Sequence, residues 1–257
     1  MYRYDPDLEF LGKVKSEDLN DLVQMLLYDK DGDARLTEEL SMRDSYKRYH
    51  PDHHQYWEDI AGEIQCYGAN TIAMWFRGGK GVLYKEILCD VCDSLKANYN
   101  ENASVERIEN CLLMGILEKS LEEMSAEEIN ELGRNLGLKN KSSITPEMIL
   151  ASCQTAFKLG GFVSYKLAMI VANAVWKALF GRGLSLAVNN SINKVLSVWA
   201  GPIGWAVTIV WTALDIAGPA KRITIPAVIQ IALLRRKLNA GDNVPGIGDD
   251  NLPILVQ

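Results

Sequence analysis

An uncharged apolar run, Val195–Leu214 (VLSVWAGPIGWAVTIVWTAL), constrains the fold more than any other stretch of this chain. About 20 apolar residues can cross a bilayer as one helix. Gly201, Pro202 and Gly204 interrupt the run near its start, and proline ends or kinks a helix but suits the first turn of the next one. We therefore predict a turn followed by a very apolar helix from about Pro202 to Ala217.

This predicted helix has no polar face, so either protein or lipid must cover it. From Pro202 to Leu214 it spans only about 20 Å at about 1.5 Å per residue, which is short of the hydrocarbon core of about 30 Å. We therefore favour a hairpin with a second apolar helix, Leu184–Val198, over a single span. We expect six residues to face a membrane or a partner, or to mark the polar ends of the hairpin. They are Trp205, Ile209, Trp211, Leu214, Lys194 and Asp215.

Charge is distributed unevenly along the chain. The whole protein carries a net charge of −6, whereas residues 159–220 carry more cations than anions. The acidic total argues against a general nucleic-acid binder. The cationic apolar part fits a membrane-facing segment, and it equally fits a buried helical core whose lysines reach the surface.

Apolar residues recur at helical spacing through most of the chain, which predicts an all-α fold. We expect a multi-helix bundle of roughly ten helices with a very apolar C-terminal helical hairpin. An acidic helical region, 1–140, would pack against an apolar helical region, 145–238, and 239–257 would be a loose tail.

Local signals place several helix ends. Ser125 and Glu128 form the pattern of a capping box, and Thr145-Pro146 is typical of a helix start. We expect a break in the helical pattern at Cys66–Gly68 and a last helix near Pro226–Leu238. The only strand-like pattern is Ile223–Ile225.

The run Asp29-Lys30-Asp31-Gly32-Asp33 is similar to part of a calcium-binding loop, because alternate oxygen ligands suit a hard cation. The spacing does not match a calcium-binding loop, however. With Asp29 as position one, Gly32 falls at position four, and Leu40 falls at position twelve, where a bidentate Glu is required. We therefore interpret this run as a polar turn.

A zinc site is the sharpest chemical alternative. All three histidines, His50, His53 and His54, lie in one predicted turn, and Cys89 and Cys92 form a C-x-x-C. Zinc in proteins takes four such ligands in a tetrahedron. Cysteines at this spacing on an apolar helix face are usually packed side chains. We expect the cysteines, Cys66, Cys89, Cys92, Cys111 and Cys153, to be reduced and mostly buried.

Several runs carry a resemblance to a known family: DPDLEFLG, YKRYHPDH, NTIAMWFRGGKGVLYKEILCDVCD and AGPIGWAVTIVWTALDIAGPA. The chain resembles the YaaW-type uncharacterised bacterial proteins over most of residues 4–235. The middle of that family has been likened to the ubiquinol–cytochrome c chaperone domain, an α-helical assembly-factor fold. The resemblance implies a helical bacterial protein and assigns no catalytic residues.

Three functional hypotheses remain. The first is a non-enzymatic protein associated with a membrane through its apolar hairpin, and the second is a soluble chaperone-like or scaffold protein whose apolar helices are core. The third is a metal-dependent enzyme that uses the histidine turn with Glu58, Asp59 or Glu63. We favour a protein without cofactor that lies in the cytoplasm or at the inner membrane. Its partner would be another protein or a lipid bilayer, and self-association is left open.

Overall fold

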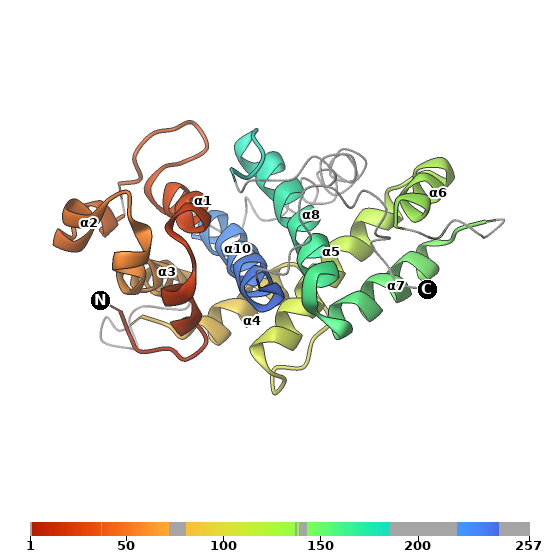
Figure 1. Cartoon of the computed structure of the whole chain (residues 1–257), viewed down its shortest axis with the longest axis horizontal. Helices are drawn as coiled ribbons and strands as arrows, with labels where there is room; N and C mark the ends of the chain where they lie inside the picture. The colour runs from red at the N-terminus through yellow and green to blue at the C-terminus, as the bar shows by residue number, and fades with distance from the viewer. Residues whose placement is uncertain are drawn as a thin grey trace.

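One long helix near the C-terminus, α10 (Lys221–Ala240), runs through the middle of the molecule (Figure 1). The structure is a computed structural model that describes residues 2–36, 38–71, 81–136, 138, 143–185 and 220–241. Almost the whole circumference of α10 is buried, as expected for a helix whose middle, Ile223–Leu234, is apolar at nearly every position. The other elements of the described ranges are arranged around it.

On one side of α10 lie the N-terminal elements, and on the other side lie α5 and α8 (Figure 1). The bounds of the elements are η1 Glu9–Lys13, α1 Ser16–Leu27, η2 Leu40–Met42, α2 Asp44–Tyr49, η3 His53–Tyr56, α3 Trp57–Thr71, α4 Tyr84–Ser94, α5 Val105–Glu122, α6 Ala126–Asn135, α7 Pro146–Leu159 and α8 Gly161–Phe180. The described residues contain no strand, only an isolated bridge between Tyr28 and Ala34. The expectation of an all-α fold is thus confirmed for the described residues, whereas the predicted hairpin lies outside the described ranges apart from Leu184 and Ser185, which are not helical.

Helix ends follow the local signals where polar side chains can reach the backbone. The capping box at the start of α6 is complete, because the side chains of Ser125 and Glu128 each accept a backbone hydrogen bond. α7 begins with Thr145 as N-cap and Pro146 at its first position. These are the positions that the sequence predicted.

The expected break at Cys66–Gly68 is wrong, because α3 continues through it to Thr71. Gly68 serves close packing instead: a β-carbon there would lie 2.5 Å from the side chain of Ile87 on α4. The strand-like run Ile223–Ile225 is likewise helical, and Pro226 lies inside α10 rather than at its start. Burial of this segment against α8 and α4 overrides its β propensity.

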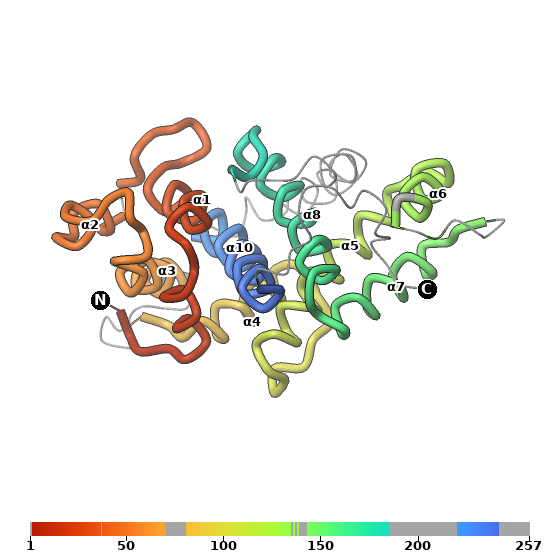
Figure 2. Tube along the Cα trace, in the orientation of Figure 1, coloured from red at the N-terminus to blue at the C-terminus, as the bar shows by residue number. Residues whose placement is uncertain are grey.

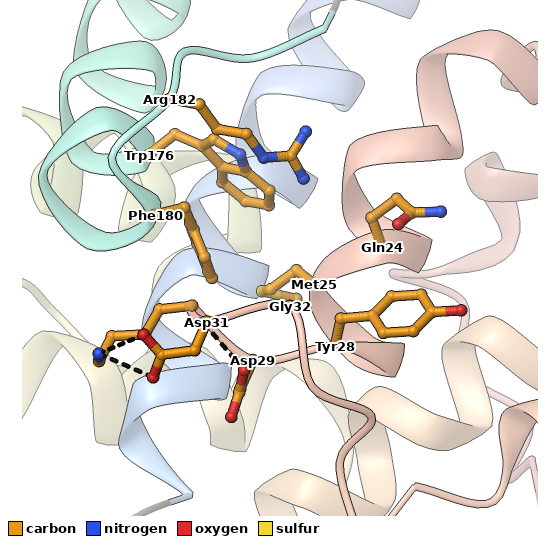
Figure 3. A pocket seen from close by; sticks show the side chains of 10 residues that line it. Gln24, Met25, Tyr28, Asp29, Asp31, Gly32, Trp176, Phe180 and Arg182 are labelled. Atoms are coloured by element: carbon orange, nitrogen blue, oxygen red, sulfur yellow. Dashed lines mark hydrogen bonds and ion pairs between the residues drawn. The ribbon is translucent and has the colours of Figure 1, made fainter.

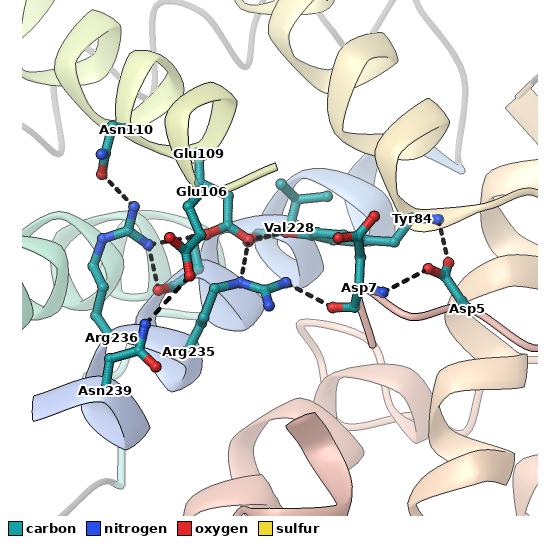
Figure 4. Close-up of polar contacts among 11 residues, drawn as sticks. Asp5, Asp7, Tyr84, Glu106, Glu109, Asn110, Val228, Arg235, Arg236 and Asn239 are labelled. Atoms are coloured by element: carbon teal, nitrogen blue, oxygen red, sulfur yellow. Dashed lines mark hydrogen bonds and ion pairs between the residues drawn. The ribbon is translucent and has the colours of Figure 1, made fainter. Parts of the chain in front are cut away.

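A buried polar network links α10 to α5 (Figure 4). The Glu109 carboxylate is fully buried and accepts hydrogen bonds from Tyr84 Oη at 2.9 Å, Arg235 Nε at 3.1 Å and Arg236 Nη1 at 3.1 Å. A buried carboxylate persists only when it is paired and hydrogen-bonded in this way. The network therefore fixes how these two helices lie against each other.

The same network reaches the N-terminal segment, which follows α10 although it comes from the other end of the chain (Figure 2). Arg235 Nη2 donates to the Asp7 carbonyl at 2.7 Å, and its guanidinium lies 4.2 Å from the centre of the Phe10 ring. Asp5 accepts a hydrogen bond from the Tyr84 backbone N–H at 2.6 Å. Asp5 and Leu8, close to the start of the described chain, are thus buried in its core.

Candidate functional site

A pocket lies between α1 and the end of α8, with a volume of about 490 Å³ (Figure 3). Helix α8 provides one wall, α1 provides the other, and the turn after α1 closes the base. The lining residues are Gln24, Met25, Tyr28, Asp29, Lys30, Asp31, Gly32, Trp176, Phe180 and Arg182. We call this the α1–α8 pocket.

Two aromatic rings form the α8 wall. Trp176 and Phe180 are one helical turn apart, and their ring centres lie 4.6 Å from each other. Trp176 is only 2% exposed, and its indole N–H has no hydrogen-bond partner within the described ranges. Because buried polar groups are usually paired, this N–H is a donor available to a bound group if the side chains around it shift.

A rigid turn forms the base. Asp29 Oδ1 accepts hydrogen bonds from the backbone N–H groups of Asp31 and Asp33 at 2.9 and 3.0 Å. These hydrogen bonds hold the pKa of Asp29 below its usual value, and the one from the Asp33 backbone contributes most. Gly32 has a φ of +88°, a conformation that favours glycine. The predicted polar turn is therefore what the structure contains.

Hydrogen bonds pin the chain that leaves α8 to α1. The Ser185 N–H donates to Asp21 Oδ2 at 2.7 Å, and Asn173 Oδ1 accepts from the Leu184 N–H at 3.0 Å. Asp21 is 1% exposed, so this bond lies in a poorly solvated place, where it is strengthened. The two walls of the pocket are thus held at a fixed spacing.

The chemistry of the pocket suits binding. Its lining combines aromatic side chains with polar and charged ones in similar measure, and it carries both charges, since Lys30 pairs with Asp31 at 2.8 Å and Arg182 lies opposite (Figure 3). The described residues contain no group of three or more His, Cys, Asp or Glu side chains that could hold a metal ion. An aromatic surface with a polar rim is typical of sites that recognise apolar groups.

The histidine turn has a structural role. His53 is 2% exposed; its ring hydrogen-bonds to Tyr56 Oη through Nδ1 and lies 3.4 Å from Asn20 Oδ1 through Nε2. Burial, and then the nearby His50, lower the pKa of His53 to about 4. His50 and His54 are exposed. The turn therefore packs η3 against α1.

The five cysteines, all within the described ranges, form no disulfide, as expected. Cys92 and Cys153 are buried, and burial raises the pKa of Cys153 to about 12. The other three, Cys66, Cys89 and Cys111, are only half-buried, so the expectation of mostly buried cysteines is correct for two of the five. Cys89 and Cys92 lie on α4 next to each other and form no part of a metal-binding group within the described ranges.

The residues chosen from the apolar run lie outside the described ranges. These are Trp205, Ile209, Trp211, Leu214, Lys194 and Asp215. No pattern in the sequence predicted the α1–α8 pocket. Its only local signal is the aromatic pair Trp176 and Phe180 at i and i+4, which shares one helix face but does not reveal that α1 lies opposite.

Comparison with known proteins places the chain in a family. A UPF0174 protein of Helicobacter pylori (strain J99) is 52% identical over 236 residues, which cover 92% of this chain and 93% of the relative. The chain belongs to the UPF0174 family. The UPF0174 protein YaaW of Escherichia coli (strain K12) is 30% identical over 243 residues, covering 93% of this chain and 97% of that protein. The resemblance to YaaW-type proteins is thus confirmed.

Two family models match this UPF0174 chain. One is described as a domain of unknown function (DUF3944) and matches residues 2–36, and the other is described as Ubiquinol-cytochrome C chaperone and matches residues 52–228. No solved structure matches the chain. The α1 wall of the pocket lies in the first matched region, and the Trp176 and Phe180 wall lies in the second.

Proposed function

We propose that the protein is a non-enzymatic, chaperone-like protein that holds a short apolar segment of a client protein in the α1–α8 pocket. The observation that carries this proposal is the pocket lining, where the Trp176–Phe180 pair of α8 lies across from Met25 of α1 and Tyr28 extends the lining towards solvent (Figure 3). The chaperone description of the family model matched by residues 52–228 supports it.

The residue types fit a chaperone better than an enzyme. The accessible aromatic side chains of the lining are Tyr28, which is exposed, and Phe180, which is half-buried, and aromatic rings of this kind bind different apolar partners. The charged residues Lys30, Asp31 and Arg182 lie at the edge of the pocket, where they keep the rim solvated and contribute little affinity. Such a surface binds many apolar segments weakly.

The experiment that tests this function compares two matched phenylalanines of α8. Phe180→Ala removes an aromatic ring from the pocket, whereas Phe162→Ala removes a half-buried ring at the other end of the helix. We expect the wild-type protein and the Phe162 variant to suppress aggregation of a chemically denatured model protein, and the Phe180 variant to lose most of this effect. Equal suppression of aggregation by both variants would show that the pocket is not the site that binds the denatured protein.

Crosslinking provides an independent readout. A photo-reactive amino acid at Tyr28, which lines the pocket and is 38% exposed, should crosslink to the same denatured protein. The control position is Tyr49 on α2, which is 40% exposed and does not line the pocket. Equal yields at the two positions would mean that binding is unspecific.

A second candidate function is membrane association, and one observation favours it. Helix α8 is the single described helix that is long and apolar enough to cross a bilayer. In the fold, however, 61% of that apolar window is buried, which is the behaviour of a core helix. The prediction of an inserted hairpin around Val195–Leu214 remains untested, and resistance of the protein to carbonate extraction from membranes is its test.

A further inference from the structure

A second surface lies at the corner where α7 meets α8 (Figure 1). The chain turns at Gly160 and Gly161, whose φ angles are +72° and +63°. At either glycine, no heavy atom beyond its chain neighbours and its own helix backbone comes within 4 Å of where a β-carbon would lie. The corner therefore projects into solvent.

Apolar side chains flank this turn. Leu159 is 73% exposed, one of the most exposed large apolar side chains within the described ranges. Phe162 and Val163 follow directly after the turn and are half-buried. The corner thus presents an apolar tip to water, which requires an explanation.

Cations surround the tip. Lys158 is exposed beside Leu159, and the Lys166 ammonium lies 4.5 Å from the centre of the Phe162 ring. From Met148 to Ser185 the sequence has four basic residues and no acidic one, although the whole chain carries a net charge of −6. The apolar tip and its two lysines thus lie in a stretch of the sequence that contains no acidic residue.

We propose that the α7–α8 corner docks this protein onto the surface of an anionic phospholipid bilayer. Leu159 and Phe162 enter the boundary between headgroups and acyl chains, and Lys158 and Lys166 contact lipid phosphates. Basic side chains are attracted to the negative surface potential of such membranes. The contact is peripheral, because it uses the end of a helix whose middle is buried in the core.

The convex shape favours lipid over a protein partner. A stable protein–protein interface needs about 800 Å² on each side, which a projecting turn with one exposed leucine does not offer. A bilayer deforms around such a tip and supplies anions on all sides. The charge of this region therefore selects anionic lipid as the occupant.

Docking at this corner leaves the α1–α8 pocket accessible. Phe162 lies in the first turn of α8 and Phe180 at its last residue, so the two are separated by about 27 Å at about 1.5 Å per residue. The membrane proposal therefore does not depend on client binding, and either one can fail alone.

The test is sedimentation of the full-length protein with vesicles of phosphatidylcholine alone or with about one third phosphatidylserine. The corner variant combines Lys158→Glu with Leu159→Ser. The control variant combines Lys47→Glu with Met42→Ser, which changes the charge equally and also removes an exposed apolar side chain, 70% exposed at Met42. We expect wild type and control to bind the anionic vesicles, and the corner variant to bind at least about 10-fold more weakly.

Three results would overturn the proposal. Equal loss in both variants would mean that binding depends on net charge alone. Equal binding to neutral vesicles, unchanged in the corner variant, would point to insertion of another apolar segment. Binding to poly-glutamate but to no vesicle would assign the corner to an acidic protein partner instead.

Discussion

The carboxylate of Glu109 lies 3.1 Å from the Arg236 guanidinium, although 127 residues separate the two in the chain. Arg235 contacts the same carboxylate, and both arginines are mostly buried. These ion pairs are the most deeply buried polar contacts between α5 and α10 in the described part of the protein.

Glu109→Gln should destabilise the protein by about 3–5 kcal/mol, because it leaves two buried guanidinium groups without a compensating charge. Glu106→Gln, one turn earlier on α5 and exposed, is the control and should change stability by no more than about 0.5 kcal/mol. Urea unfolding followed by circular dichroism measures both. Similar midpoints for the two variants would contradict a stabilising role of the network.

Glu63 should make the protein less stable as the pH rises. It is 4% exposed, and burial raises its pKa to about 7 from the usual 4.5. The folded state holds this proton more tightly than the unfolded state, so stability falls as the pH rises from about 4.5 through 7. Glu63→Gln keeps an acceptor for the Glu39 N–H. It should remove the pH-dependent loss of about 2–3 kcal/mol in the free energy of unfolding. A plot of melting temperature against pH should therefore be flatter over that range than the plot for wild type.

His53 should act in the opposite direction. Burial lowers its pKa to about 4 from 6.5, so the unfolded state takes up a proton first, and stability falls as the pH decreases from about 6.5 towards 4. His53→Gln should reduce the fall in stability between about pH 6.5 and 4. The same variant should be less stable than wild type near neutral pH. His54→Gln, at the exposed neighbouring position, serves as reference, and an unchanged acid limb in the His53 variant would refute the assignment.

Two helical glycines should respond in opposite ways to alanine. At Gly68 the new β-carbon would lie 2.5 Å from the fully buried Ile87 side chain, so Gly68→Ala should destabilise by about 1–3 kcal/mol. At Gly115 the nearest atom would be Ala97 Cβ at 3.4 Å. Gly115→Ala should therefore be neutral, or stabilising by up to about 1 kcal/mol through helix propensity, and thermal melts compare the two.

Thiol labelling of the native protein should separate the cysteines into two groups. Cys92 and Cys153 are buried, and burial raises the pKa of both thiols, so few thiolates are present and reagents cannot reach them. The half-buried Cys66, Cys89 and Cys111 should react first. Mass spectrometry after timed quenching measures each site, and early labelling of Cys92 or Cys153 would indicate that their helices open locally.

Local chemistry explains what could be predicted from the sequence. The capping box at Ser125 and the start of α7 at Pro146 depend on residues within a few positions of each other, so a short window contains all the information. The all-α class follows from apolar periodicity in the same way.

The features that the sequence does not predict depend on partners that are distant in the chain. A short stretch of sequence around Gly68 predicts a helix break, because it does not include Ile87. The close approach of the Ile87 side chain is what requires a residue without a side chain at Gly68. The α1–α8 pocket brings together Tyr28 and Phe180, which more than half of the chain separates. The pairing of Glu109 with α10 is equally invisible to periodicity, since a glutamate on a helix is usually a solvated residue.

The central position of α10 has a consequence for how the protein is made. On the ribosome, every other described helix emerges before Lys221–Ala240 does. The apolar faces of α1, α3, α4 and α8 that α10 covers therefore stay exposed until α10 has been synthesised. Native pairing of Asp7 with Arg235 must bridge 228 residues, and such long-range contacts form slowly. A polypeptide that stalls before α10 thus exposes the same kind of apolar surface that chaperones recognise.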